Sequence, residues 1–229
     1  MKKFFLGLRD GFPIALAYVS VSFTFGLLAT EGGLSIFTAF LISLTNLTSA
    51  GQFAGLDIIL SLGTILELAV TTLIINLRYF LMSFAISQRV DKSMTTVQRL
   101  ICSFGITDEV FAVICQREEK TTFKYFLGLI ILPIIGWSTG TLIGAGASML
   151  LPKTVRTALS IAIYGMFIAI IIPPAKRFKP YFIAIGISVA ISCIFRYTPF
   201  LNLLSGGWVI IIASVLSAAF CAYYFPIKR

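Results

Sequence analysis

The stretch that decides the fold runs from Ser43 to Asp57, SLTNLTSAGQFAGLD. It starts as an apolar helix, becomes polar and glycine-containing at residues 49–52, and then resumes as an apolar segment beside an acid. Backbone outside a helix is tolerated at membrane depth only where protein buries it or where it lines a wet cavity. In a chain this apolar, the stretch therefore predicts a broken or re-entrant membrane helix, the kind of place where transporters bind substrate.

Composition assigns the whole chain to the polytopic integral membrane proteins. Of 229 residues, 58% are hydrophobic and only 12% are charged, whereas soluble globular domains have about 25% charged residues. We therefore expect an all-α helix bundle that forms a single transmembrane domain over residues 1–229. A weak internal echo, residues 24–28 against residues 138–142, suggests that the second half, 122–229, repeats the first.

Counting apolar runs predicts about six to eight membrane segments, because about 20 residues are needed to cross the hydrocarbon core. Two runs, 34–47 and 100–115, are too short for ordinary spans, and the run 58–86 contains a turn candidate at Gly63. Glycines at four-residue spacing after Pro133 predict a helix that packs tightly against a neighbour. The remaining runs are full spans: 12–30, 123–151, 155–172, 181–195 and 208–225.

The formal net charge of +9 is carried by Lys and Arg residues in the short gaps between apolar runs. This distribution follows the positive-inside rule and forms no continuous basic face for nucleic acid. If the chain turns back at Gly51 without crossing, both termini and most basic gaps are cytoplasmic. If residues 34–60 cross instead, the basic gap at 89–99 moves outside, so we favour the re-entrant arrangement.

The sequence excludes several classes of enzyme and of metal or nucleotide site. Histidine is absent, which rules out a Ser/His hydrolase and a His-ligated metal. The four cysteines show no CxxC spacing that would indicate a metal site. The nearest match to a phosphate-binding loop, residues 146–154, has Pro152 where its second glycine should stand. We expect no enzyme activity, no cofactor, no metal and no nucleotide.

The polar break supplies the first candidate binding residues, Ser49, Gly51, Gln52 and Phe53. A helix that ends near Ser49 and restarts near Gln52 leaves backbone N–H and C=O groups without helical partners. The N-terminus of the restarted helix carries a partial positive charge that suits a carboxylate. The alternative interpretation is a capped kink that binds no ligand.

Three further candidates lie on the apolar segment after Gly63, namely Glu67, Asn76 and Arg78. Glu67 and Arg78 share a helix face but stand about 16 Å apart along the axis, too far for an ion pair. Each therefore needs a partner from another segment or from a substrate, although Arg78 could also extend to the membrane surface. For Asn76 we expect a structural role at the carbonyls of the broken helix.

Two adjacent acids, Asp108 and Glu109, complete the candidate set. Neighbouring side chains point about 100° apart on a helix, so we expect one acid to pair with Arg78 while the other faces a cavity. An acid in a dehydrated cavity has a raised pKa and can exchange protons near neutral pH. A solvated pair of acids on the cytoplasmic side is the alternative.

The motifs of roughly the first 115 residues resemble the AzlC (YgaZ-like) family, the large subunit of bacterial branched-chain amino acid exporters. No single motif is specific, but their order and spacing are. Beyond residue 115 the likeness lies mainly in hydropathy, Trp137 and the glycines. The motifs are Pro13, FGLLA at 25–29, SAGQF at 49–53, NLRY at 76–79 and TDEVF at 107–111.

This resemblance implies export of valine, leucine, isoleucine or similar amino acids across the bacterial cytoplasmic membrane, together with a small AzlD-like membrane subunit. We then expect the break to hold the backbone groups of the amino acid and Phe53 to contact its side chain. Asp108, Glu109 or Glu67 would provide a counter-charge or carry a coupling proton. The alternative is a non-transporting scaffold or regulatory subunit whose polar motifs only bind the small partner.

Overall fold

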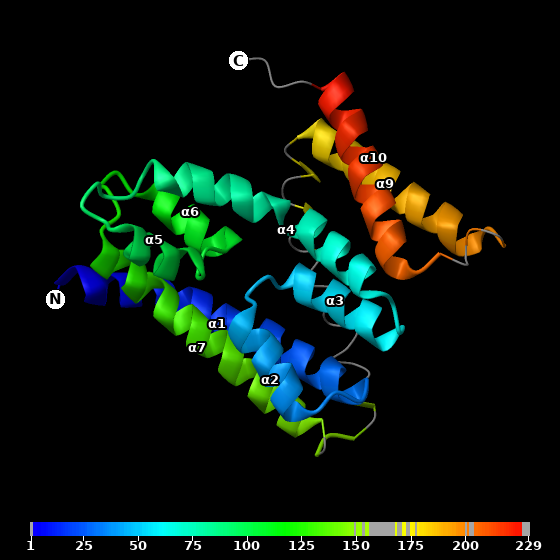
Figure 1. The fold of residues 1–229 in the computed structure, drawn as a ribbon, viewed down its shortest axis with the longest axis horizontal. Coiled ribbons are helices and arrows are strands. Elements are labelled where there is room, and N and C mark those ends of the chain that lie inside the picture. Colours follow the sequence, from blue (N-terminus) through cyan, green and yellow to red (C-terminus); the bar gives the residue numbers. More distant parts are fainter. Residues whose placement is uncertain are drawn as a thin grey trace. The chain divides into compact units, whose positions relative to one another are not determined.

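The computed structural model describes residues 2–148, 150–152, 154–155, 168, 171–172, 175–176, 178–199, 201 and 204–225. Over these residues the regular structure is helical, apart from an isolated bridge between Val90 and Thr121. The expected all-α membrane bundle is therefore confirmed, while the span expected at 155–172 lies largely outside the described residues. Five described helices are long and apolar enough to cross a membrane: α1 (Lys2–Glu31), α4 (Ile65–Ser87), α7 (Phe123–Ala147), α9 (Lys179–Tyr197) and α10 (Gly206–Tyr224) (Figure 1).

Four shorter helices occupy the regions that the sequence marked as too short for ordinary spans. Helix α2 (Ile36–Thr45) has 10 residues and α3 (Ala50–Leu60) has 11, so each reaches only about half of the hydrocarbon core. Helices α5 (Thr96–Ser103) and α6 (Asp108–Gln116) are shorter still. The runs 34–47 and 100–115 therefore contain helices that are each too short to cross the hydrocarbon core alone.

The chain divides into two compact units. Unit 1 comprises residues 1–52 and 76–160, and unit 2 comprises residues 53–75 and 161–229. The expectations of one transmembrane domain and of an internal repeat stay predictions.

The core of unit 1 is the pair formed by α1 and α7, which lie side by side along their length (Figure 1). A Cβ at Gly26 would overlap the carbonyl oxygen of Thr141, and a Cβ at Gly144 would overlap that of Phe23. Only glycine permits so close an approach of two backbones, and close van der Waals contact is what holds helices together in a bilayer. The tight packing predicted for this helix is confirmed.

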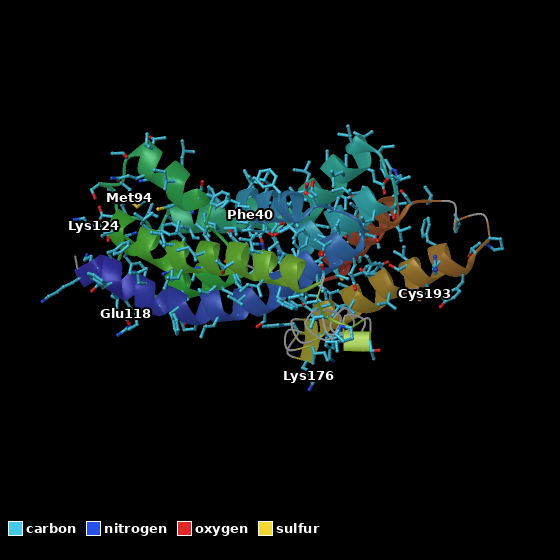
Figure 2. The ribbon with its side chains drawn as sticks, turned by 90° about the horizontal axis from the view of Figure 1, so that it is seen from below. Phe40, Met94, Glu118, Lys124, Lys176 and Cys193 are labelled. Atoms are coloured by element: carbon cyan, nitrogen blue, oxygen red, sulfur yellow. The ribbon has the colours of Figure 1, made fainter. Side chains whose placement is uncertain are left out.

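Two connecting loops of unit 1, α4–α5 and α6–α7, are hydrogen-bonded to each other at one end of the unit. The N–H of Asp91 donates to the carbonyl of Thr121, and the N–H of Thr121 donates to the carbonyl of Arg89, each at 2.9 Å. These bonds join the α4–α5 loop to the α6–α7 loop. Met94, Glu118 and Lys124 lie at this end, close to the start of α1 (Figure 2). The cytoplasmic location of both termini stays a prediction.

Unit 2 contains a helical hairpin made by α3 and the first half of α4. The predicted turn at Gly63 is confirmed, because its N–H donates to the carbonyl of Ile58 at 2.8 Å. The left-handed backbone of the turn falls on Leu62, with a φ of 56°. Helices α9 and α10 pack against each other in the same unit, as expected for the spans 181–195 and 208–225 (Figure 1).

Candidate functional site

The break in the membrane helix lies at residues 46–49, between the end of α2 and the start of α3. The side chain of Asn46 accepts a hydrogen bond from the N–H of Thr48 at 3.2 Å. This local bond competes with the helix and ends α2 earlier than the sequence suggested. Ser49 has a left-handed φ of 48°, a strained conformation for a residue other than glycine. Gly51 and Gln52 therefore belong to the first turn of α3. The sequence predicts that the first helix ends near Ser49 and that the second begins near Gln52, whereas α2 ends at Thr45 and α3 begins at Ala50.

Gln52 ties this first turn to the rest of unit 1. Only 3% of the residue is exposed, and its amide nitrogen donates to the hydroxyl of Ser43 at 3.0 Å. The Ser43 hydroxyl lies 2.7 Å from that of Thr141 on α7. The other half of the amide, Oε1, is buried without a hydrogen-bond partner among the described residues. The hydrogen bond from its amide nitrogen therefore holds the Gln52 side chain in place, while its amide oxygen can still accept a hydrogen bond.

The structure places Asn76 directly against the break. A Cβ at Gly51 would lie 3.1 Å from Nδ2 and 3.2 Å from Oδ1 of Asn76, and 2.5 Å from Oγ1 of Thr48. The absence of a side chain at Gly51 therefore lets α4 approach the break. Within the described part of the chain, Oδ1 of Asn76 and Oγ1 of Thr48 are both buried without a hydrogen-bond partner.

A cavity of about 300 Å³ opens beside the break, a volume at the lower end of small-molecule sites. Its wall comes from three segments, all in unit 1. Sequence reasoning found Asn76 but missed Tyr79 and Ser83, although their spacing of three and seven residues puts all three on one helix face. The lining residues are Thr45–Thr48 of α2 and the break, Asn76, Tyr79 and Ser83 of α4, and Ser103, Phe104 and Ile106 near the α5–α6 turn.

Arg78 and Asp108 form the ion pair that the sequence led us to expect. Nη1 of Arg78 lies 2.6 Å from Oδ2 of Asp108, with 40% and 48% of the two side chains exposed. The guanidinium also lies 5.0 Å from the ring centroid of Tyr79. Asp108 opens α6, where a negative charge is favourable to the helix dipole. The ion pair lies next to the cavity, because Tyr79, which the Arg78 guanidinium contacts, lines the cavity wall.

The second acid, Glu109, is engaged by the first helix. Its Oε2 accepts a hydrogen bond from the hydroxyl of Tyr18 at 2.5 Å. The Tyr18 ring is buried and lies edge-on to Trp137, with 5.1 Å between the ring centroids. The sequence predicts that the second acid faces a cavity, whereas Glu109 contacts Tyr18 and is not among the residues that line the cavity beside the break. The sequence signal for Tyr18 was a phenol inside an apolar span, since a buried tyrosine hydroxyl usually finds a partner.

Glu67 lies in unit 2, and its partner comes from another segment, as expected. The residue is 2% exposed, and its Oε1 accepts from the hydroxyl of Ser205 at 2.5 Å and from the N–H of Gly207 at 3.0 Å. Ser205 precedes α10, so the carboxylate sits at the positive end of the α10 dipole. A Cβ at Gly63 would lie 2.9 Å from Oε2 of Glu67. The geometry gives Glu67 a structural role, and its part in proton coupling stays a prediction.

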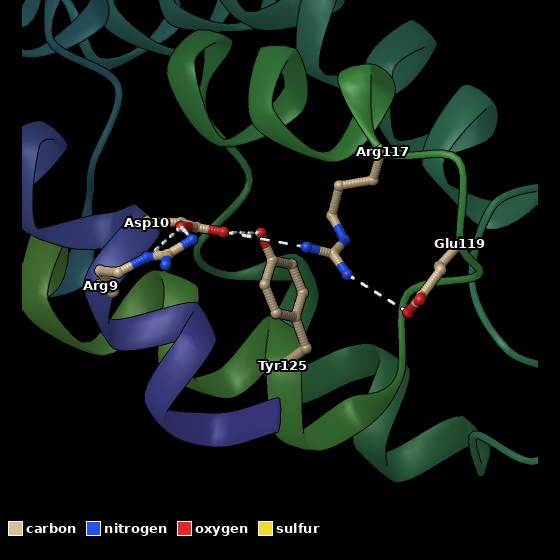
Figure 3. Close-up of polar contacts among 5 residues, drawn as sticks. All are labelled: Arg9, Asp10, Arg117, Glu119 and Tyr125. Carbon is tan, nitrogen blue, oxygen red and sulfur yellow. Dashed lines mark hydrogen bonds and ion pairs between the residues drawn. The ribbon is translucent and has the colours of Figure 1, made fainter. Parts of the chain in front are cut away.

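A further polar network, which sequence reasoning missed, joins the start of α1 to the α6–α7 loop and the start of α7 (Figure 3). Nη1 of Arg117 lies 3.8 Å from Oδ2 of Asp10, and Nη2 lies 3.5 Å from Oε2 of Glu119. The guanidinium covers the ring of Tyr125 at 4.0 Å. The Tyr125 hydroxyl donates to Asp10 at 2.8 Å. In the sequence, the only indication of this network is Asp10, an acid among the basic residues near the N-terminus.

Replacing Arg117 by glutamine is expected to loosen this end of unit 1. The two ion pairs and the ring contact are lost together, which we expect to lower the local opening free energy by about 1 kcal/mol. Amide hydrogen exchange over residues 117–122, followed by mass spectrometry, should accelerate roughly fivefold. Lys124→Gln, at an exposed position nearby, is the control. Equal exchange in the two variants would contradict a role for the network.

Over the described residues, no group of three or more Cys, Asp or Glu side chains is placed to hold a metal ion. The cavity wall offers hydrogen-bonding and apolar side chains, and the Arg78–Asp108 ion pair lies next to it.

Comparisons with known proteins identify the family. The model of the AzlC protein family matches residues 13–151, a range that includes the break, the cavity and both carboxylates of α6. An uncharacterized membrane protein of Archaeoglobus fulgidus is 35% identical over 74% of this chain and 75% of its own length. The inner membrane protein YgaZ of Escherichia coli K12 is 27% identical over 76% of this chain and 74% of its own. No solved structure matches. The chain belongs to the AzlC family of membrane proteins.

Proposed function

We propose that this chain is the transport subunit of an exporter that moves branched-chain or similar hydrophobic amino acids out of the cell. It works in the bacterial cytoplasmic membrane as a multi-pass protein, with both termini in the cytoplasm and with a small AzlD-like membrane subunit as its partner. The observation that supports this proposal most directly is the cavity beside a broken helix in a membrane protein of this family.

The wall of the cavity combines the two kinds of surface that a hydrophobic amino acid needs. Leu47, Phe104 and Ile106 provide apolar contact, while Thr48 and Asn76 provide polar atoms. Helix α3 begins at Ala50, directly after the break, and its N-terminus carries a partial positive charge that suits a carboxylate, although the residues that line the cavity end at Thr48 on this side. Phe53 follows in α3 and stays a predicted contact for the substrate side chain.

Asp108 is the proposed carrier of the coupling proton. Its segment, α6, is too short to cross the membrane. Burial raises the pKa of the Asp108 carboxyl, against the opposing effect of the Arg78 guanidinium, and the neighbouring Glu109 raises it further. A higher pKa brings protonation closer to neutral pH, as proton coupling requires. Glu109 and the buried Glu67 are the other acids from which a proton can be exchanged.

Efflux of labelled leucine or valine from cells that produce the chain and its small partner tests this function. Gln52→Ala removes the side chain that holds the first turn of α3, and Asp108→Asn removes the titrating group. We expect each to lower the efflux rate roughly tenfold or more, the effect of about 1.4 kcal/mol in the barrier. Gln88→Ala changes an exposed glutamine outside the cavity wall and is the matched control.

Unchanged efflux in both Gln52→Ala and Asp108→Asn would contradict the site assignment. Reconstitution into liposomes separates transport from the alternative role as a scaffold or regulatory subunit. A transporter moves leucine, and an imposed pH gradient accelerates it. A scaffold binds the small partner without moving substrate.

A further inference from the structure

Two unpaired oxygens converge at one end of the cavity. Oγ1 of Thr48 and Oδ1 of Asn76 are buried, and neither has a hydrogen-bond partner among the described residues. Both lie within 3.2 Å of the point where a Cβ of Gly51 would stand, so they flank the same backbone position, and both residues line the cavity. Buried polar atoms in native proteins are nearly always hydrogen-bonded, so two unpaired oxygens on residues that line the same cavity indicate a missing donor.

The helix that ends beside these oxygens favours the same kind of ligand. Helix α2 stops at Thr45, and its last turn contains no basic residue. The final carbonyl groups of a helix point beyond its end and carry a partial negative charge. With the oxygens of Thr48 and Asn76, this end of the cavity therefore attracts a cation or a group rich in N–H donors.

The carboxylates of α6 are engaged elsewhere. Asp108 pairs with Arg78, and Glu109 accepts the hydroxyl of Tyr18. Neither acid is among the residues that line the cavity. A cationic group inside the cavity therefore meets neutral oxygens and a helix terminus, not a carboxylate.

We infer that the ammonium group of the transported amino acid binds to the neutral oxygens of Thr48 and Asn76, beside the C-terminus of α2. This inference rests on the proposed function and assigns the ammonium end of the substrate to the part of the cavity wall formed by the end of α2, Thr48 and Asn76. Asp108 is then free to titrate without contact to the substrate.

Binding of three probes to the purified full-length chain tests this inference by calorimetry. Leucine has both charged groups, isopentylamine has only the ammonium, and 4-methyl-2-oxopentanoate has only the carboxylate. Thr48→Val keeps the shape of the side chain and removes its hydroxyl. We expect it to weaken leucine and isopentylamine binding about tenfold, the effect of one hydrogen bond to a charged group, and to leave the oxo acid unchanged.

A second variant keeps the test independent of lost packing. Asn76→Asp has nearly the same size and adds a negative charge, so it should tighten isopentylamine binding several-fold. Thr139→Val is the control, because the Thr139 hydroxyl lies outside the cavity wall and donates to the carbonyl of Ile135 on its own helix at 2.7 Å.

Three results would overturn the inference. The first is equal weakening of leucine and the oxo acid by Thr48→Val, and the second is isopentylamine binding that ignores both variants. The third is a Thr48-dependent requirement for sodium with unchanged amine binding, which would mean that the oxygens hold a metal cation. Failure of the wild-type chain to export leucine, with amine binding that still depends on Thr48, would contradict the proposed function alone.

Discussion

Gly144→Ala is expected to prevent the close packing of α1 on α7 and to destabilise unit 1 severely. The added methyl group would overlap the carbonyl oxygen of Phe23 and lie 2.6 Å from its carbonyl carbon. Backbone atoms in the middle of a helix cannot rotate away as a side-chain tip can, so the two helices have to separate. Overpacking of this kind costs about 1–3 kcal/mol or more, a large share of the roughly 5–15 kcal/mol that keeps a domain folded.

Thermal unfolding of the detergent-solubilised protein, followed by size-exclusion chromatography, measures this effect. Gly146→Ala is the matched control, because it makes the same substitution two residues further along α7, where a Cβ would meet no atom of the described residues within 4 Å. We expect Gly146→Ala to unfold at the wild-type temperature. Indistinguishable melting of the two variants would contradict the close approach of α1 and α7.

Glu67→Ala is expected to destabilise unit 2 by about 3 kcal/mol or more. The substitution leaves the hydroxyl of Ser205 and the N–H of Gly207 without their acceptor, and hydrogen bonds to a charged group contribute about 1.5–3 kcal/mol. It also removes the negative charge from the N-terminus of α10, which adds about 0.3–1 kcal/mol. The same thermal unfolding assay measures this loss, with Glu118→Ala at an exposed position as the control.

Glu67→Gln separates the structural role of this residue from its predicted role in proton coupling. The amide oxygen still accepts hydrogen bonds from Ser205 and Gly207, so we expect most of the stability to remain. The amide cannot take up a proton near neutral pH, so efflux driven by a pH gradient falls if Glu67 exchanges the coupling proton. Wild-type stability in Glu67→Ala would contradict the capping of α10. Wild-type efflux in a stable Glu67→Gln would assign the proton to another acid.

Hydropathy predicted the long helices well, because the need to bury backbone hydrogen bonds in a bilayer dominates every local preference. It also predicted that the runs 34–47 and 100–115 are too short for ordinary spans, and the helices there have ten residues or fewer. The re-entrant arrangement stays a prediction. The position of the break was predicted a few residues too late, since one side-chain bond from Asn46 ends α2 before the apolar run does. Such a bond depends on local geometry that hydropathy does not reveal.

Parts of the site were predictable because charges in apolar segments must find partners. From the sequence alone, this argument pairs Arg78 with one acid of α6. It did not find Ser205 as the partner of Glu67 or Tyr18 as the partner of Glu109, since these contacts join residues 138 and 91 positions apart. Ser103 and Phe104 were missed for the same reason, because only tertiary packing brings the α5–α6 turn to the cavity.

The Arg78–Asp108 pair has a consequence for the electrical behaviour of the carrier. Opposite charges in this pair cancel, and the cavity wall has no charged side chain among its described residues. An amino acid zwitterion that passes through it moves no net charge. With one proton entering for each amino acid exported, the proposed proton coupling carries one full charge inward. Voltage acts on that charge with about 2.3 kcal/mol per 100 mV, so export should produce a measurable inward current.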